Sequence, residues 1–289
     1  MPLQNITSQV KIHQESLLQL LQEFDRVCRK LDIKYTLFAG TMLGAVRHNG
    51  FIPWDDDLDV LMLREDYDRF LKNAETVLDA EKFFLQKEFS QHWPMFFSKL
   101  RMNNTTCLEK FHPKDKEMHQ GIYMDIFPCD NLADSNFAAK CQFYASKVVI
   151  AKSLYKRGYD TDSTKKKIFM TFCRILPAKP FVSFVKHSRK KGKRVHTFFA
   201  AASKYHKNIL QRSSIETVAP MQFEDKQYLV CTDFHSILTL LYGDYMQLPP
   251  EQERMIKQHA ILVDVHNSYQ MYADYRDDMT FDIYTRSIR

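Results

Sequence analysis

Hydrophobic residues in the first part of the chain recur at helical spacing. Seven apolar side chains between residues 8 and 31 lie three or four positions apart, with charged residues between them: Leu17, Leu20, Leu21, Phe24, Val27, Cys28 and Leu31. This pattern predicts an amphipathic helix. The next segment, "DIKYTLFAG", changes to a short run of strand-forming residues that stops at Gly40, and it predicts a buried strand.

Helix and strand patterns then alternate up to about residue 130. "TMLGAVRHNG" predicts a short helix that ends at a turn, "DLDVLML" predicts a second strand, and "REDYDRFLKNAETVLD" restores helical spacing. Further strands are predicted near 83–88, 95–101 and 121–127. From about 132 to 210 the chain is predicted to be wholly helical, with extended chain again near 216–230.

Length and composition predict one composite α+β unit. The chain has 289 residues, 45% of them apolar and 26% charged, which is typical of a globular protein. We predict a catalytic core over 1–131, a helical and basic insertion over 132–215, and a C-terminal part over 216–289 that completes the catalytic unit. The six cysteines are scattered and indicate neither a zinc knuckle nor a disulfide framework. With no signal-peptide pattern and no long apolar run, a cytoplasmic location is expected.

A cluster of acidic residues interrupts this pattern. "FIPWDDDLDV" places four aspartates within five positions. Side chains alternate along a strand, so Asp57 and Asp59 should share one side, with Asp55 in the same parity and Asp56 facing elsewhere. Converging carboxylates suit Mg²⁺ shared with a phosphate-bearing substrate, and the cation would relieve their repulsion. Surface turns also produce Asp-x-Asp, but this pair opens an apolar strand, where unpaired carboxylates are costly.

A glycine-threonine turn lies upstream of the aspartates. Small residues at Gly40 and Thr41 would let backbone N–H groups at a helix start approach a phosphate. This turn followed by Asp-x-Asp resembles the layout of the nucleotidyltransferase superfamily. A third carboxylate usually completes such a metal site, and "GIYMDIFP" supplies Asp125.

Four ordered motifs sharpen the resemblance. "YTLFAGTMLGAVRHNGFIPWDDDLDVLMLREDYDRF" resembles the signature of LicD-type phosphotransferases, a family that includes the fukutin-like proteins. The stretches "FFSKLRMNNTTCLE", "GIYMDIFPCD" and "LYGDYMQLPPEQERMIKQH" match in the same order. The resemblance implies a nucleotidyltransferase-like mixed sheet flanked by helices. It also implies transfer of phosphocholine from CDP-choline to a sugar hydroxyl of a surface glycan, with release of CMP.

Roles for individual residues follow from this resemblance and from phosphoryl-transfer chemistry. Asp57, Asp59 and Asp125 would hold Mg²⁺ or Mn²⁺, and Asp55 would be a further ligand or the general base. The residues expected at the donor phosphates are Gly40, Thr41, Arg47, Lys99 and Arg101. The candidate aromatic contacts for the quaternary ammonium are Trp54, Tyr123, Tyr242 and Tyr245. His259 is a candidate base or phosphate contact. The alternatives are surface ion pairs for the cations, core packing for the aromatics and a solvent-facing histidine.

Residues 165–194 combine phenylalanines with clustered basic residues, ending in "KHSRKKGKRVH". An acceptor built on a lipid carrier would bring the enzyme to the inner face of the cytoplasmic membrane, where this segment could bind as a peripheral anchor. A buried helical hairpin with a solvated basic end is the alternative. Nucleic acid is not expected as a partner, because aromatic residues are not interleaved with the basic ones.

The function classes that remain open differ in donor and in turnover. Teichoic acid, lipopolysaccharide and capsule are all candidate acceptors. CDP-ribitol or CDP-glycerol could replace CDP-choline as the donor, because the same metal site would serve them. A non-catalytic nucleotide-binding module is the alternative of a different class, and the full set of Asp57, Asp59 and Asp125 argues against it.

Overall fold

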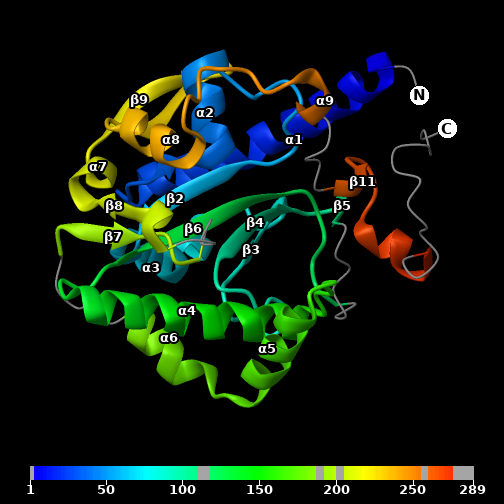
Figure 1. Cartoon of the computed structure of the whole chain (residues 1–289). Coiled ribbons are helices and arrows are strands. Elements are labelled where there is room, and N and C mark those ends of the chain that lie inside the picture. The colour runs from blue at the N-terminus through cyan, green and yellow to red at the C-terminus, as the bar shows by residue number, and fades with distance from the viewer. Residues whose placement is uncertain (1–2, 110–116, 187–191, 200–204, 255–259, 276–289) are drawn as a thin grey trace.

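A mixed β-sheet lies at the centre of the molecule, with helices on both sides (Figure 1). The computed structural model describes residues 3–109, 117–186, 192–199, 205–254 and 260–275. The main path of the sheet runs in the order β1 (Thr36–Leu37), β2 (Asp59–Leu63), β6 (Tyr123–Asn131), β4 (Ser98–Met102) and β3 (Phe83–Gln86). Two short strands, β7 (Arg194–His196) and β8 (Ile209–Gln211), extend it beyond the end of β6.

Strand direction in this sheet places the residues of the predicted site. β2 and β6 are parallel, and Asp59 is the register partner of Asp125. β4 is antiparallel to β6 on its other side, with Lys99 opposite Asp125. Two smaller antiparallel pairs accompany the main sheet: β9 (Val218–Phe223) with β10 (Lys226–Cys231), and β5 (Thr106–Glu109) with β11 (Ala260–Asp264).

The helices form two groups. In Figure 1, α1 (Leu3–Lys30), α2 (Ala39–His48) and α8 (Phe234–Tyr242) lie above the sheet, and α4 (Asn136–Arg157), α5 (Thr164–Ile175) and α6 (Ala178–Lys186) lie below it. The remaining helical elements are α3 (Arg64–Asn73), α7 (Arg212–Glu216), α9 (Glu251–Arg254), η1 (Ala74–Thr76), η2 (Tyr205–Asn208) and η3 (Tyr269–Tyr275).

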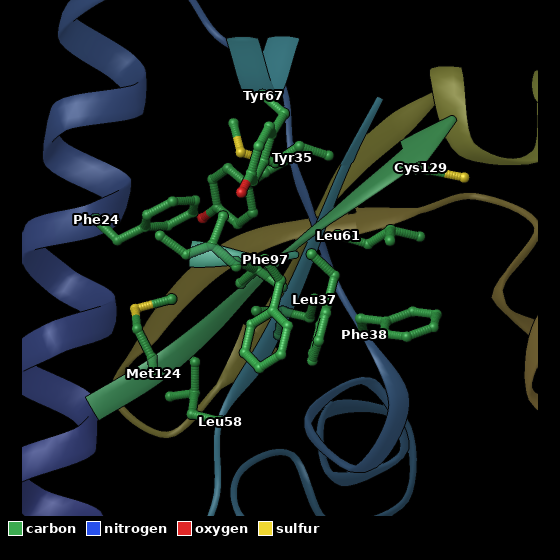
Figure 2. Close-up of a cluster of buried hydrophobic side chains, with 14 of the residues drawn as sticks. Phe24, Tyr35, Leu37, Phe38, Leu58, Leu61, Tyr67, Phe97, Met124 and Cys129 are labelled. Atoms are coloured by element: carbon green, nitrogen blue, oxygen red, sulfur yellow. The ribbon is translucent and has the colours of Figure 1, made fainter. Parts of the chain in front are cut away.

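The apolar face of α1 forms one wall of the core. The helix-spaced residues Leu17, Leu20, Leu21, Phe24, Val27 and Cys28 are fully buried. Figure 2 shows Phe24 pointing towards Tyr35, and their rings are 5.0 Å apart. Each fully buried leucine or phenylalanine contributes roughly 2 kcal/mol, so this face fixes α1 on the sheet. The same buried cluster contains residues from all three predicted parts of the chain, and the division into those parts stays a prediction.

Most elements predicted from the sequence are confirmed. The structure is α+β with a mixed sheet, and α1, β1, α2, β2 and α3 follow in the predicted order. The prediction that 132–210 is wholly helical is wrong, because β7 and β8 lie within it. Each of these strands has only three residues, too few to show a period. β7 pairs with the end of β6 and β8 pairs with β7, and this tertiary pairing decides their conformation.

In the described part of the chain no single helix is long and apolar enough to cross a membrane. Helices α5 and α6 together have the length and apolar composition of a membrane-spanning segment, but they are bent by 98° relative to each other.

Candidate active site

Two neighbouring strands bring the distant aspartates together. Asp59 opens β2, and the parallel pairing places it beside Asp125 in the middle of the sheet. The backbone N–H of Asp125 donates to the carbonyl of Leu58 at 2.8 Å, which fixes this register just before the two carboxylates. The convergence predicted for Asp59 and Asp125 is therefore present in the backbone itself.

Asp55 and Asp57 approach the cluster from irregular chain. β2 begins at Asp59, two residues later than predicted, so Asp57 does not lie on the strand. Both side chains face the first turn of α2, since a Cβ added to Gly40 would lie 2.7 Å from Oδ2 of Asp55 and 3.8 Å from Oδ1 of Asp57. Asp56 faces elsewhere, as predicted, and its carboxylate accepts a hydrogen bond from the backbone N–H of Ala260 at 3.2 Å.

The start of α2 holds the acidic segment in place. The hydroxyl of Thr41 accepts a hydrogen bond from the backbone N–H of Asp59 at 2.8 Å. The structure thus places Gly40 and Thr41 directly against the aspartates, at a helix N-terminus, whose partial positive charge favours anions. Their contact with a donor phosphate stays a prediction.

The carboxylates influence one another strongly. Burial, followed by the charges of Asp57, Asp125 and Asp55, raises the pKa of Asp59 well above its usual value. Burial also raises the pKa of Asp125, while Lys99 opposes this rise. The four acidic groups therefore form one electrostatic unit that a bound cation would stabilise.

A buried chain of ion pairs stands behind Asp125. Lys99 is 1% exposed, and its Nζ lies 2.9 Å from Oδ1 of Asp125 and 3.1 Å from the centre of the Tyr123 ring. On its other side Lys99 faces Glu109 at 3.8 Å, and Glu109 is also paired with Arg157. Burial opposes ionisation of Glu109, but the charges of Lys99 and Arg157, with that of Arg101, lower its pKa to about 2.

Lys99 and Arg101 both have protein partners. Arg101 donates from Nε to Gln86 at 2.7 Å and from Nη1 to the carbonyl of Gly121 at 2.8 Å, and it is 1% exposed. The structure thus brings Lys99 to the aspartates and places Arg101 one layer behind. The contact predicted between these two side chains and a diphosphate stays a prediction.

A second pair of cations is formed by Arg47 and Arg254, and Arg47 is close to Tyr242, whose hydroxyl is also affected by the charges of the aspartates. Arg47, at the end of α2, donates to the carbonyl of Tyr245 at 2.8 Å, and its Nε is buried without a hydrogen-bond partner. Burial and the nearby charge of Arg254 lower the pKa of Arg47. Two like charges side by side are unfavourable unless an anion joins them, so Arg47 and Arg254 form a candidate phosphate contact.

Of the four aromatic residues predicted to contact the quaternary ammonium of choline, only two are partly exposed. Tyr242 is 45% exposed, and the charges of Asp59, Asp55 and Asp57 help burial to raise its pKa. Trp54 is half-buried and already carries the guanidinium of Arg254 at 5.0 Å from its ring centre. Tyr123 stacks on Lys99, and Tyr245 is buried with its hydroxyl 2.9 Å from Nδ1 of His235. Tyr242 is thus the aromatic ring best placed beside the aspartates.

Neither Arg254 nor Glu109 is predicted from the sequence as a site residue. Both lie inside stretches that match the family motifs, and that was the available signal: Arg254 in "LPPEQERMIKQH" and Glu109 at the end of "FFSKLRMNNTTCLE". His259, the predicted base or phosphate contact, lies outside the described residues.

The donor chemistry of the cluster fits a hard divalent cation. Its groups are carboxylate oxygens, which Mg²⁺ and Mn²⁺ prefer, and their mutual repulsion supplies a reason to bind one. Among the residues that the structure describes, no three acidic, histidine or cysteine side chains are already arranged as metal ligands. A bound ion would therefore have to draw the carboxylates together, and Asp125 would have to share its charge between the ion and Lys99.

Comparison with known proteins supports these observations. Residues 32–155 match the family model described as LicD/FKTN/FKRP, nucleotidyltransferase domain. The chain is 27% identical over 263 residues to the lipopolysaccharide cholinephosphotransferase LicD of Haemophilus influenzae, covering 84% of this chain and 93% of that protein. An uncharacterized protein of Rickettsia prowazekii is 51% identical over 122 residues, which are 42% of each chain. The matched region contains all four clustered aspartates and Lys99, so the candidate site lies within the part of the chain that matches the LicD family model.

Proposed function

We propose that this protein is a metal-dependent phosphotransferase that moves phosphocholine from CDP-choline to a sugar hydroxyl of a surface glycan and releases CMP. The observation that carries the proposal is the convergence of Asp55, Asp57, Asp59 and Asp125 at the start of α2. The near full-length similarity to a lipopolysaccharide cholinephosphotransferase supports the choice of phosphocholine and favours lipopolysaccharide over teichoic acid or capsule as the acceptor type. We further assign the central sheet to the nucleotidyltransferase type, which the description of the matching family supports.

In this proposal Asp57, Asp59 and Asp125 would hold Mg²⁺ or Mn²⁺. When bound, the ion neutralises negative charge on the transferred phosphate. Lys99 keeps Asp125 ionised and oriented through its 2.9 Å contact. Gly40 has no side chain, which leaves Asp55 and Asp57 room to lie against the start of α2.

The remaining residues act on the donor and the acceptor. Arg47 and Arg254 bind the diphosphate oxygens, and the exposed ring of Tyr242 receives the quaternary ammonium. Asp55 accepts the proton of the acceptor hydroxyl as its oxygen attacks the phosphorus of phosphocholine. The bond from that phosphorus to the bridging oxygen breaks, and CMP leaves with the electron pair.

An assay of CMP release tests the proposal directly. The protein is incubated with Mg²⁺ and each of CDP-choline, CDP-ribitol and CDP-glycerol, with and without lipopolysaccharide. We expect CMP release that depends on both metal and acceptor and is fastest with CDP-choline. Release of CMP with CDP-ribitol or CDP-glycerol instead would change the proposed donor but leave the proposed reaction class standing. The absence of CMP with every donor, on folded protein, would favour a non-catalytic nucleotide-binding module.

We also propose that α5 and α6 bind the inner face of the cytoplasmic membrane, where a lipid-linked acceptor would be found. Large apolar side chains of α5 are exposed: Ile168, Phe169, Phe172 and Ile175. Lys165, Lys166 and Lys167 begin the same helix, so apolar and basic groups are adjacent, as interfacial helices require.

A further inference from the structure

A large cavity that none of the clustered aspartates lines lies between α4, α6 and the loop over residues 89–94. Its volume is about 970 Å³, within the size range of small-molecule binding sites. The floor is largely apolar, with Phe89, Pro94, Val149 and Val182 among its lining residues. Such a cavity could hold a ligand with an apolar part.

Cations outnumber acids around this cavity. The basic residues that line it are Lys152, Lys156, Arg157, Lys179 and Lys186, against the single carboxylate of Asp68 among the described lining residues. Asp68 is itself 3.6 Å from Arg64 and so is already compensated. The cavity therefore carries a net positive charge.

The cations differ in how well they are compensated. Arg157 and Lys186 pair with Glu109 and Glu88, two carboxylates that do not line the cavity. Lys152 donates to the backbone carbonyls of Arg174 and Leu176, which are neutral.

Lys156 and Lys179 are exposed and form no ion pair with another residue that the structure describes. In addition, Lys152 and Lys156 are four residues apart on one helix face, where like charges repel. An anion bound between them would remove this repulsion.

One of the lining residues, Arg157, has a buried hydrogen-bond donor. The side chain of Arg157 is 11% exposed, and its Nε has no hydrogen-bond partner. Leaving a buried donor unsatisfied is costly, so a ligand that accepts from it gains free energy.

We infer that this cavity binds a phosphate group carried on an amphiphilic molecule, with the phosphate among Lys152, Lys156, Lys179 and Arg157 and the apolar part against Val149 and Val182. None of the clustered aspartates lines this cavity, so it would be a second binding site beyond the one that the proposed transfer reaction uses. The phosphate could be that of a lipid headgroup or of a free phosphorylated compound.

Two soluble probes separate these sources without a membrane: inorganic phosphate, and dihexanoyl phosphatidic acid kept below its micelle concentration. Calorimetric titration of the full chain should show binding, and the lipid should bind more tightly if the apolar floor contributes. The double variant Lys156→Gln with Lys179→Gln should weaken binding at least about tenfold, because both charges are lost. Both lysines are exposed, so the variant should unfold at the same temperature as the natural protein.

Lys140→Gln is the matched control, because Lys140 is an exposed lysine of α4 that does not line the cavity. Binding that is lost in the double variant and kept in Lys140→Gln supports the inference for whichever probe binds. Absence of binding with both probes would overturn it. An equal loss in Lys140→Gln would do the same, since it would mean that only general surface charge is involved.

Discussion

Asp59 combines two properties that conflict in a purely structural residue. It opens an apolar strand in the centre of the sheet, and its pKa is raised by burial and by the carboxylates around it. A negative charge in this position costs free energy in the absence of a cation. We therefore expect Asp59 to lower the free energy of unfolding of the metal-free protein, and to contribute favourably only when a cation is bound.

Substitution of the clustered aspartates tests this expectation. Asp57→Asn and Asp59→Asn should each abolish CMP release while leaving the free energy of unfolding of the metal-free protein unchanged or about 1 kcal/mol higher, because repulsion is reduced. Denaturant unfolding with and without Mg²⁺ provides the measurement. Asp56→Asn is the control, since Asp56 faces Ala260 and not the cluster. A large loss of stability in Asp59→Asn without metal would instead indicate a structural role.

The acidic residues of the site could be predicted from the sequence, but several of their partners could not. Motif order was enough to select Asp55, Asp57, Asp59 and Asp125, although the parity expected for Asp55 and Asp57 does not apply, because both lie in irregular chain before β2. The ion pair of Lys99 with Asp125 depends on the antiparallel register of β4 and β6, which no local pattern encodes. The network through Glu109 and the approach of Arg254 to Arg47 were missed because they join parts of the chain that are distant in sequence.

At the scale of elements, α2 contains two glycines with different surroundings, and only Gly40 lies against the aspartates. A Cβ at Gly40 would meet the movable carboxylate of Asp55 at 2.7 Å, whereas a Cβ at Gly44 would meet the backbone carbonyl of Gly50 at 2.4 Å. The first contact can be relieved by turning a side chain, and the second requires movement of the chain.

Gly40→Ala should therefore reduce CMP release about tenfold or more by displacing Asp55, with little change in stability, because alanine favours a helix by about 1 kcal/mol. Gly44→Ala should lower the free energy of unfolding by roughly 1–3 kcal/mol. Turnover assays and denaturant unfolding on both variants separate the two effects. Full turnover in Gly40→Ala would show that the position of Asp55 is not needed.

The exposed face of α5 carries the prediction about membranes. Phe172→Glu should weaken binding to vesicles of phosphatidylglycerol, because an apolar ring in the interface is replaced by a charge that anionic lipid repels. Phe137→Glu is the matched control, since Phe137 is also exposed but lies at the start of α4. Sedimentation with vesicles measures the binding. Equal loss in both variants would contradict a specific role for α5.

Long elements were predictable because their periods are long enough to read. α1 shows several helical turns of burial, while β5, β7, β8 and β11 have between three and five residues each. Their partners lie far along the chain, as β11 pairs with β5 across about 150 residues. Such strands are defined by the tertiary fold and not by their own sequence.

At the scale of the whole molecule, buried histidines make stability depend on pH. Burial lowers the pKa of His13 and of His196 to about 4, with the nearby charge of Lys147 adding to the effect at His196. The unfolded chain protonates a histidine near its usual value of about 6.5, so it binds more protons between the two values. The stabilisation that is present above about pH 6.5 is lost as the pH falls towards 4.

His196→Gln isolates one of these groups, because glutamine can still donate to the carbonyl of Tyr205 but does not titrate. Between pH 8 and pH 5 the natural protein should lose about 2 kcal/mol of stability relative to the variant. Denaturant unfolding at both pH values measures the difference. A difference that does not change with pH would mean that His196 stays neutral or is already charged in both states.

The parallel pairing of β2 with β6 has a consequence for the way the protein is made. Asp59 leaves the ribosome long before its neighbour Asp125, and β3 and β4 are synthesised between them. Until β6 has emerged, Asp55, Asp57 and Asp59 lack the fourth aspartate, Asp125, and the ion pair that Asp125 forms with Lys99. Parallel strands that are separated in this way along the chain pair late in folding. A nascent chain would therefore complete the proposed cation site only when its central sheet is complete, and metal binding would report on the completion of folding during translation.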